Sequence, residues 1–342
     1  MRKLLNVLYV TSPDSYIACE RENVVVRVQD REAFRIPVHN LEGIVTFGYA
    51  GVSPALIHLC CERGVAISFL KENGEFLGRI YGPVSGNVLL RRKQYRIADD
   101  AAGVKLAKRF IFAKIANCRA VLHRALRDHA EELDEPLVRQ TVRSLQALLR
   151  LALDADSYDE LRGLEGDAAR KYFSAFQQLI LHEKTFFRMN GRSRRPPLDP
   201  VNAMLSFCYT LLVHEVQAAL ESVGLDPAVG FLHRDRPGRP GLALDLMEEL
   251  RPYLADRLVL SLINRRQVAP NGFRTQENGM VVMTADTRKQ LITAWQKRKQ
   301  EEIRHPYLNE KIPVGLLPYV QALLLARHLR GDLAEYPPFL WK

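Results

Sequence analysis

The chain has 342 residues, 47% of them hydrophobic, and its 49 lysines and arginines against 39 acidic residues give a formal charge of +10. A single core stops growing at about 250 to 300 residues, so this length allows two domains with cores of their own. The basic excess favours a polyanionic partner, with nucleic acid first and an anionic membrane surface second.

A membrane location is disfavoured, because no apolar run approaches the roughly 20 residues that a spanning helix needs. The chain begins with a basic segment, but a long apolar stretch and a small-residue cleavage site do not follow it. Its five cysteines lack the paired spacing of a disulfide framework or a zinc site, which favours reduced thiols. We therefore expect a cytoplasmic protein that does not bind membranes.

Residues 1–86 are predicted to form a small β-rich domain, mainly antiparallel, with one helix. Short apolar segments such as NVVVRV, GIVTF and AISFL have strand composition and are separated by turn-forming residues. The helix is expected over residues 53–63, with Ser53 as its N-cap, Pro54 in its first turn and Gly64 ending it. Strand edges exposed in such a domain make it the expected dimer contact.

Residues 87–342 are predicted to form a larger, mainly α-helical catalytic domain, which makes the fold class α+β. Apolar residues recur there with the helical period of 3.6. The helices are expected at residues 105–129, 137–154, 158–180, 201–223, 244–264, 287–304 and 314–329. Two connections rich in arginine, proline and glycine, residues 188–200 and 234–241, cannot be continuous helix.

The segment FLHRDRPGRPGLALDLMEELRPYLAD, residues 231–256, contains the most informative group of polar residues. If Gly241 begins a helix, the carboxylates of Asp245 and Glu248 project from the same face of it. A buried carboxylate between leucines needs a partner that satisfies its charge. With His233 nearby, these acids are a donor set that suits Mg²⁺ or Mn²⁺. The sequence leaves open whether Asp245 or Glu248 makes the closer contact with the metal.

A third acid, Glu165, lies between two glycines in an otherwise helical pattern, RGLEG. Each glycine weakens a helix by about 1 kcal/mol, so the close approach of another backbone or of a ligand would explain both. The structural alternative is that Glu165 forms an ion pair with Arg162 or Arg170 on a solvated face.

Basic residues surround these acids, and guanidinium groups beside a carboxylate-bound cation suit phosphodiester chemistry. The next helix opens with Asp199 as its N-cap and is apolar on more than one face, so it should run through the domain centre. The basic run at residues 297–299 is interpreted as solvated.

Three blocks in order resemble the CRISPR-associated spacer integrases, a near-universal adaptation family: LRGLEGDAARKYF, DPVNAMLSFCYTLL and GFLHRDRPGRPGLALDLMEELRP. The third block is most similar to the type I-C branch. The resemblance implies a Mg²⁺ or Mn²⁺ site built from Glu165, His233 and Glu248, with Asp245 as a neighbouring catalytic acid. It also implies DNA contacts by Tyr209 and Arg251, and the loop arginines complete the predicted DNA-binding set: Tyr209, Arg234, Arg236, Arg239 and Arg251.

The implied function is that of a metal-dependent DNA integrase and endonuclease. A 3′-hydroxyl of a short DNA fragment attacks a phosphodiester of a repeat array, and the implied partners are double-stranded DNA, a second copy of the chain, and a small second adaptation protein. Two alternatives stay open from the residues: a structure-selective nuclease of DNA repair, and a non-catalytic DNA-binding scaffold whose acids only form ion pairs with arginines.

Overall fold

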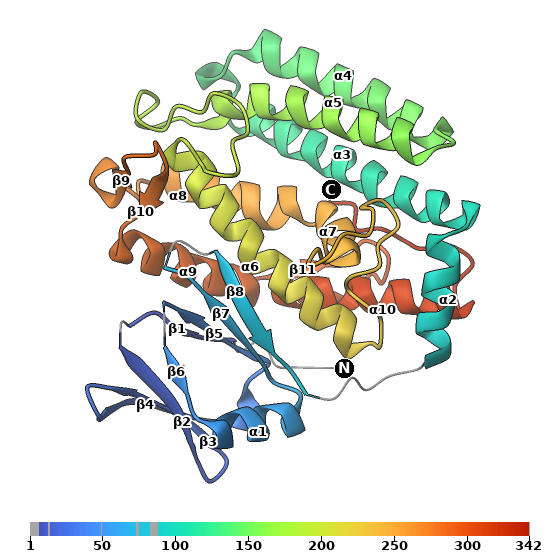
Figure 1. The fold of residues 1–342 in the computed structure, drawn as a ribbon. Helices are drawn as coiled ribbons and strands as arrows, with labels where there is room; N and C mark the ends of the chain where they lie inside the picture. The colour runs from blue at the N-terminus through green and yellow to red at the C-terminus, as the bar shows by residue number, and fades with distance from the viewer. Residues whose placement is uncertain (1–6, 13, 49, 73–74, 83–87, 342) are drawn as a thin grey trace. The chain divides into compact units, whose positions relative to one another are not determined.

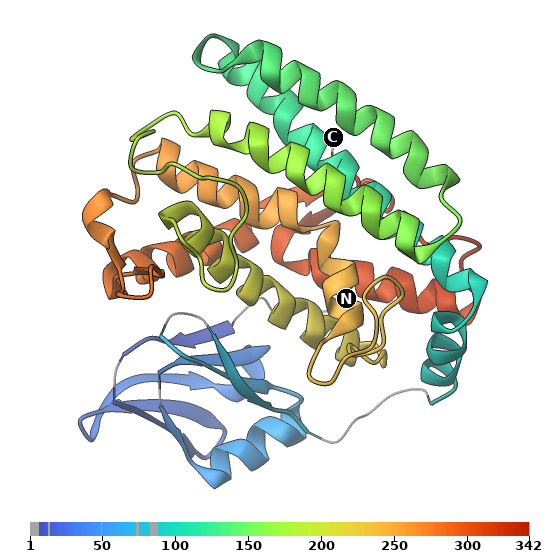
Figure 2. The ribbon, with the colours of Figure 1, turned by 45° about the horizontal axis from the view of Figure 1, so that its top comes forward.

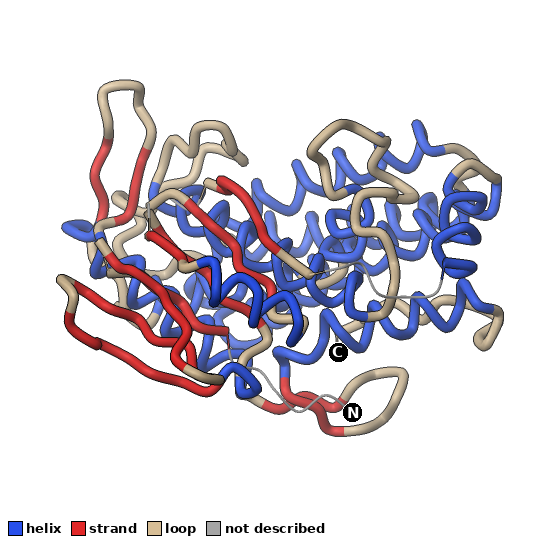
Figure 3. Tube along the Cα trace, turned by 60° about the horizontal axis from the view of Figure 1, so that its bottom comes forward, coloured by secondary structure: helices blue, strands red, loops and turns tan. Residues whose placement is uncertain are grey.

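The computed structural model describes residues 7–12, 14–48, 50–72, 75–82 and 88–341. The chain divides into two compact units, Met1–Ser85 and Gly86–Lys342, and each is considered by itself (Figure 1). The predicted boundary after residue 86 lies outside the described residues. Strands are concentrated in the first unit and helices in the second (Figure 3), so the predicted α+β class is confirmed.

The first unit contains two four-stranded sheets with the orders β1-β5-β7-β8 and β4-β3-β2-β6. Their strands are β1 (Val7–Val10), β2 (Ser15–Glu20), β3 (Asn23–Val28), β4 (Arg31–Pro37), β5 (Gly43–Phe47), β6 (Gly51–Val52), β7 (Ala66–Leu70) and β8 (Phe76–Ile80). Three of the six described pairings, β1 with β5, β5 with β7 and β2 with β6, are parallel. The prediction of a mainly antiparallel domain was therefore wrong.

Helix α1 (Pro54–Arg63) lies between strands β6 and β7 in the chain and has the predicted ends. The Ser53 side chain accepts a hydrogen bond from the Leu56 amide, and Gly64 adopts the left-handed conformation with φ 68°. Buried apolar residues of α1 and of both sheets, among them Leu56, Ile17 and Ile44, form one core cluster. This shared core makes the unit a single folded body.

The second unit is built from helices (Figure 2). They are α2 (Val88–Ala98), α3 (Ala101–His129), α4 (Glu135–Asp154), α5 (Tyr158–Phe176), α6 (Pro200–Ser222), α7 (Gly241–Glu248), α8 (Arg257–Asn264), α9 (Ala285–Gln300) and α10 (Leu317–Arg330). Helices α3, α4 and α5 contact one another as one layer, whereas α6 packs against α7 and α10 (Figures 1 and 2). Helix α2 was not predicted.

The single helix predicted over residues 244–264 is divided into α7, a π-helical turn at Pro252–Asp256, and α8. Proline lacks the amide hydrogen that continues the helical ladder, which accounts for the irregular turn. The helix predicted over residues 287–304 ends at Gln300, because Glu302–Arg304 (β11) pairs with Lys311–Pro313 (β12). A second short hairpin joins β9 (Phe273–Thr275) to β10 (Val281–Met283).

Helix α6 is the central helix of this unit and begins as predicted, with the Asp199 carboxylate accepting from the Asn202 amide at 2.7 Å. By length and composition, α6 could cross a membrane, so the expectation that no segment approaches that length was wrong. More than half of its most apolar window is buried within the protein. This burial is the property of a core helix and agrees with the central position predicted for it.

Candidate active site

Three helices of the second unit bring one lysine and two glutamates together. Lys114 of α3 donates to Glu165 of α5, and its Nζ atom lies 2.7 Å from Oε2 of Glu248 on α7. The lysine and Glu248 side chains are only 7% and 3% exposed. Burial alone would lower the pKa of Lys114, but the charges of Glu248 and Glu165 raise it above its usual value. The ammonium group is therefore a buried cation between two carboxylates.

Glu248 has a second cationic partner, since Oε1 lies 2.9 Å from Nη1 of Arg251 one helical turn further along. Burial alone would raise the pKa of Glu248, but the charges of Arg251 and Lys114 outweigh it and lower the pKa to about 2. The charge of His233 contributes in the same direction, which places that imidazole near the carboxylate. Glu248 is therefore ionised at neutral pH.

Asp245 is completely buried and holds His233 in place. One carboxylate oxygen accepts from the Phe231 and Leu232 amides at 2.6 and 2.9 Å, and the other accepts from the His233 amide at 3.1 Å. That second oxygen also lies 2.5 Å from Nδ1 of His233. Because a carboxylate oxygen accepts, Nδ1 is the nitrogen that donates to Asp245, and Nε2 is the ring nitrogen left for another partner.

Two glycines allow the His233 segment to wrap closely around Asp245. A Cβ atom on Gly230 would lie 2.7 Å from Oδ2 of Asp245, and one on Gly241 would lie 2.6 Å from the Ala228 carbonyl oxygen. Gly241 also begins α7, three residues before the predicted helix start at Leu244, so the condition set for a shared face of Asp245 and Glu248 is met. Any larger residue at either position would push the segment away from the carboxylate.

Helix α2 supports the same segment from its other end. The buried Gln94 side chain donates to the Asp226 and Val229 carbonyl oxygens at 2.7 and 2.8 Å and accepts from the Asp226 amide at 2.9 Å. Tyr95 adds a hydrogen bond to the Asp226 carboxylate. Sequence reasoning missed this role, because residues 90–96, LRRKQYR, have the composition of an exposed basic segment.

Tyr209 of α6 lies beside this cluster. Its hydroxyl donates to Asp256 at 2.6 Å, and the guanidinium carbons of Arg251 and Arg192 lie 4.8 and 5.2 Å from its ring centroid. Burial raises the pKa of Asp256 to about 6, although the hydrogen bonds from Tyr209 and Tyr172 oppose the shift. Sequence reasoning missed Asp256 and Arg192, which hold this tyrosine in position.

The predicted DNA-binding residues fall into two groups. Tyr209 and Arg251 are part of the packed cluster beside Glu248, and the Arg251 side chain is 12% exposed. Arg234 and Arg236 are exposed in the loop after His233, and Arg239 is half-buried. Arg234 lies 3.5 Å from the exposed Asp159 carboxylate. Only the loop group is open to a large partner in the structure as it stands.

A second buried network surrounds Glu249, at the end of α7. The Glu249 carboxylate accepts from the Tyr336 hydroxyl, the Gln321 amide and the Phe339 backbone amide at 2.6 to 3.0 Å. Asn117 of α3 donates to the Glu249 carbonyl oxygen at 2.7 Å, three residues along α3 from Lys114. Burial raises the pKa of Glu249 to about 7. The carboxyl-terminal segment thus secures the end of α7, a function that the sequence did not indicate.

No three His, Cys, Asp or Glu side chains in the described part of the chain lie close enough together to hold a metal ion as they stand. The site nevertheless fits a hard divalent ion in its chemistry. Glu165 and Glu248 already converge on a cation, and the contact of the buried Oε2 of Glu248 is the Lys114 ammonium at 2.7 Å. The third predicted ligand, His233, uses Nδ1 for its contact with Asp245, which leaves Nε2 as the nitrogen that could bind an ion.

The glycines beside Glu165 have open space around them. A Cβ atom added to Gly163 or Gly166 would meet nothing within 4 Å. Close approach of another part of the described chain therefore does not explain these glycines. The proposed ion pairs of Glu165 with Arg162 and Arg170 are also not formed, because those arginines contact Asp159 and Asp167.

Comparison with known proteins identifies the family. The family described as "CRISPR associated protein Cas1" matches residues 8–297 of the chain. The chain belongs to the Cas1 family. A relative from Chlorobaculum tepidum, named CRISPR-associated endonuclease Cas1 1, is 52% identical over 343 residues and covers all of both chains. A second, from Rhodospirillum rubrum, is named CRISPR-associated endonuclease Cas1 2 and is 51% identical over 346 residues, again covering both chains completely.

Solved structures share the fold at lower identity. A casposase bound to integration product has a TM-score of 0.83 at 24% identity, with 96% of this chain and 92% of the other covered. The Cas6-RT-Cas1–Cas2 complex has a TM-score of 0.84 at 23% identity, and the match covers all of this chain and 36% of the other. Membership confirms the predicted family and its function, that of an integrase and endonuclease of CRISPR adaptation.

Proposed function

We propose that the chain inserts short DNA fragments into a repeat array by transesterification in the cluster around Glu165, Glu248 and His233. The 3′-hydroxyl of the incoming fragment attacks a phosphodiester of the repeat. A new phosphorus–oxygen bond forms, the existing one breaks, and the released 3′-oxygen takes up a proton. The observation that carries the proposal is the convergence of two glutamates on a buried cation beside a positioned histidine.

The proposed ligands of a Mg²⁺ or Mn²⁺ ion are Glu165, Glu248 and Nε2 of His233. A bound ion would supply positive charge to the phosphate oxygens as the hydroxyl attacks. Asp245 would position His233 rather than bind the ion, because both of its oxygens already accept hydrogen bonds from the His233 segment. This geometry favours Glu248 over Asp245 as the ligand from α7.

Double-stranded DNA is the proposed substrate, both as incoming fragment and as repeat array. The formal charge of +10 and the exposed loop arginines Arg234 and Arg236 support binding to phosphates, and Arg239 extends the same loop. The open space around Gly163 and Gly166 would admit a DNA backbone beside Glu165. Tyr209 and Arg251 would contact the DNA end next to the acids.

The proposed assembly is a homodimer that binds the small second adaptation protein. Support for the second protein comes from the named Cas1–Cas2 complex, whose chain shares this fold. The β-rich unit is the proposed dimer contact, because edge strands β4 and β8 present exposed Phe34, Phe76 and Leu77. We also propose the type I-C branch, from the wording of residues 230–252, and a cytoplasmic location suited to a DNA substrate.

The test is a strand-transfer assay with a 3′-hydroxyl fragment labelled at its 5′ end and a repeat-containing duplex. Glu165→Gln and His233→Ala should each abolish the joined product while the far-ultraviolet circular dichroism stays unchanged. Asp167→Asn on the same helix and the exposed His129→Ala are matched controls that should integrate normally.

Each outcome separates the proposed function from its alternatives. Normal joining by both site variants would contradict the proposed catalytic cluster. Cleavage of branched DNA without any joined product would favour a repair nuclease. DNA binding that is indifferent to Mn²⁺ and to EDTA, with neither cleavage nor joining, would favour a scaffold.

A further inference from the structure

We propose that Lys114 is a built-in competitor of the divalent ion: its ammonium group occupies the position between Glu165 and Glu248 and must leave for the ion to bind. The inference rests on the proposed metal site. It adds a residue that none of the three recognisable sequence blocks contains, since Lys114 lies on α3, outside them.

The contacts of Lys114 are those of a bound cation. Its Nζ atom reaches one carboxylate on α5 and a second on α7, while the body of its side chain is buried in the helical unit. Oε2 of Glu248, which is buried, faces the ammonium at 2.7 Å. The ammonium therefore provides the positive charge that both carboxylates require.

The charge balance explains why ion and ammonium would exclude each other. With Lys114 and Arg251 in contact, the two glutamates already have two neighbouring positive charges. A divalent ion added between the carboxylates would bring two more within a few ångströms of the ammonium, in a site shielded from water, where like charges repel strongly. Arg251 contacts the other oxygen of Glu248, so it can remain when the ion binds.

Lysine suits a displaceable role better than arginine. Its charge is a single point on a flexible chain of four methylene groups, whereas a guanidinium fork is planar and would form two directional bonds. Without metal, Lys114 would keep the carboxylates paired and the three helices together. With metal, the same carboxylates would exchange one cation for another, so the fold would change little.

The experiment measures Mn²⁺ affinity by isothermal titration calorimetry at pH 8, with the full-length protein and no DNA. Lys114→Met removes the charge and keeps the length of the side chain. We expect its Kd for Mn²⁺ to fall by about tenfold or more relative to the wild type. Lys108→Met is the matched control, because Lys108 lies on the same helix and contacts the exposed Asp156 instead. Its Kd should equal that of the wild type.

Thermal unfolding gives a second readout that does not depend on activity. In EDTA, Lys114→Met should melt at a lower temperature than the wild type, since two carboxylates then lack their shared cation. Saturating Mn²⁺ should raise its melting temperature more than that of the wild type. If Lys114→Met does not fold, Lys114→Gln is used in the same two assays. A structure of the wild type with Mn²⁺ is then determined as well.

The outcomes distinguish this inference from the proposed function. Unchanged or weaker Mn²⁺ binding by Lys114→Met, with normal binding and strand transfer by the wild type, would overturn the competitor role alone. No Mn²⁺ binding by either protein would overturn the proposed metal site and this inference with it. In the Mn²⁺ structure, an Nζ atom still in contact with both carboxylates beside the bound ion would also overturn it.

Discussion

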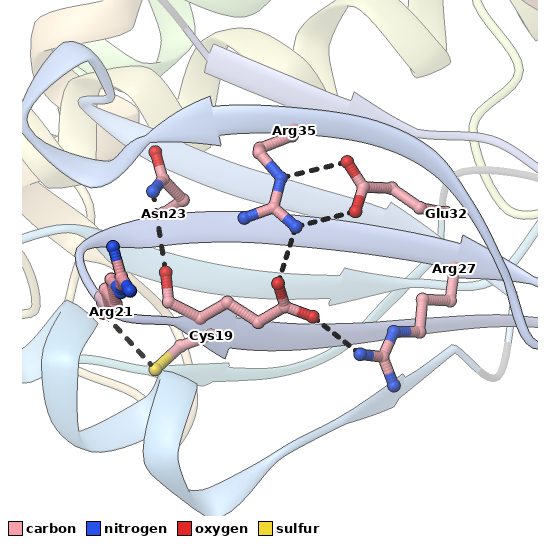
Figure 4. A network of polar contacts seen from close by, with 7 residues as sticks. Cys19, Arg21, Asn23, Arg27, Glu32 and Arg35 are labelled. Carbon is pink, nitrogen blue, oxygen red and sulfur yellow. Dashed lines mark hydrogen bonds and ion pairs between the residues drawn. The ribbon is translucent and has the colours of Figure 1, made fainter.

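Two ion-pair networks, one in each unit, join the same kinds of side chains but differ in exposure to water. On the sheet of the first unit, Glu20 contacts Arg27 and Arg35, and Arg35 contacts Glu32 (Figure 4). The Glu20 side chain is 39% exposed. In the second unit, Lys114, Glu165, Glu248 and Arg251 form a chain of contacts in which Glu248 is 3% exposed.

Exposure decides what each network can do. Exposed ion pairs add little to the stability of the fold, because water solvates both charges and dissolved ions screen them. Buried charges have lost their hydration, so each depends on its partner, and removal of one leaves the others uncompensated. Substitutions in the exposed network should therefore have little effect on stability, whereas the buried network holds its three helices together.

The largest expected effect is that of Glu248→Ala. This change leaves Lys114 with one partner and Arg251 with no carboxylate, and breaking a buried pair costs roughly 3–5 kcal/mol. Urea unfolding in EDTA should show a loss of that size in the free energy of unfolding, and strand transfer should disappear. Glu20→Ala is the exposed counterpart, and equal losses in the two variants would contradict the distinction between the networks.

The second largest expected effect is the change in the free energy of unfolding with pH. Burial raises the pKa of Glu249 to about 7, above its unfolded value of 4.5, so the folded state holds this proton more tightly. Its contribution is complete below pH 4.5 and is lost as the pH rises through 7, a change on the order of 3 kcal/mol. Arg35 and Arg27 lower the pKa of the exposed Glu20, whose contribution is instead lost as the pH falls.

Urea unfolding of the wild type and of Glu249→Gln at pH 5, 6, 7 and 8 measures this contribution. The wild type should lose more stability than Glu249→Gln as the pH rises across this range. Exposed Glu277→Gln is the control and should follow the wild type. Parallel curves for the wild type and Glu249→Gln would show that Glu249 titrates alike in the folded and unfolded states.

A third effect tests how His233 is positioned. Asp245→Asn replaces an acceptor with an amide that can donate to Nδ1, which would favour the wrong tautomer and take the lone pair from Nε2. Loss of such a supporting carboxylate costs about 10- to 100-fold in activity or metal affinity. Strand-transfer rates should fall within that range. Asp235→Asn, in the exposed loop, should match the wild type, and an unchanged rate for Asp245→Asn would exclude the positioning role.

Local signals in the sequence predicted most of the elements. Local side chains, within a few positions of one another, indicate the caps at Ser53 and Asp199 and the strands β5 and β7. The parallel pairing of β1 with β5 was missed, because it joins segments separated by another sheet in the chain. Periodicity identifies strands but does not identify their neighbours.

Only part of the candidate site was predicted, because local patterns do not reveal contacts between residues that are distant in the sequence. Glu165, His233, Asp245 and Glu248 occur in recognisable blocks, whereas Lys114 lies in an ordinary helical pattern 51 residues from Glu165. Lys299 is a parallel case: it was interpreted as solvated but is buried, with its ammonium 2.8 Å from Glu215. A lysine becomes a buried cation only through a partner distant in sequence, which local composition does not reveal.

The smallest expected effect is that of Arg35→Gln in the exposed network. Loss of the arginine removes its contacts to Glu20 and Glu32. Water still solvates both acids, and Arg27 still contacts Glu20. The melting temperature should fall only slightly at low salt, and the difference should vanish at 1 M NaCl, where the Debye length is about 3 Å. Lys114→Met, measured in EDTA beside it, should keep most of its deficit at both salt concentrations, because dissolved ions screen the buried pair of Lys114 and Glu248 much less. A deficit in Arg35→Gln that persists in 1 M NaCl would show that exposure does not separate the two networks.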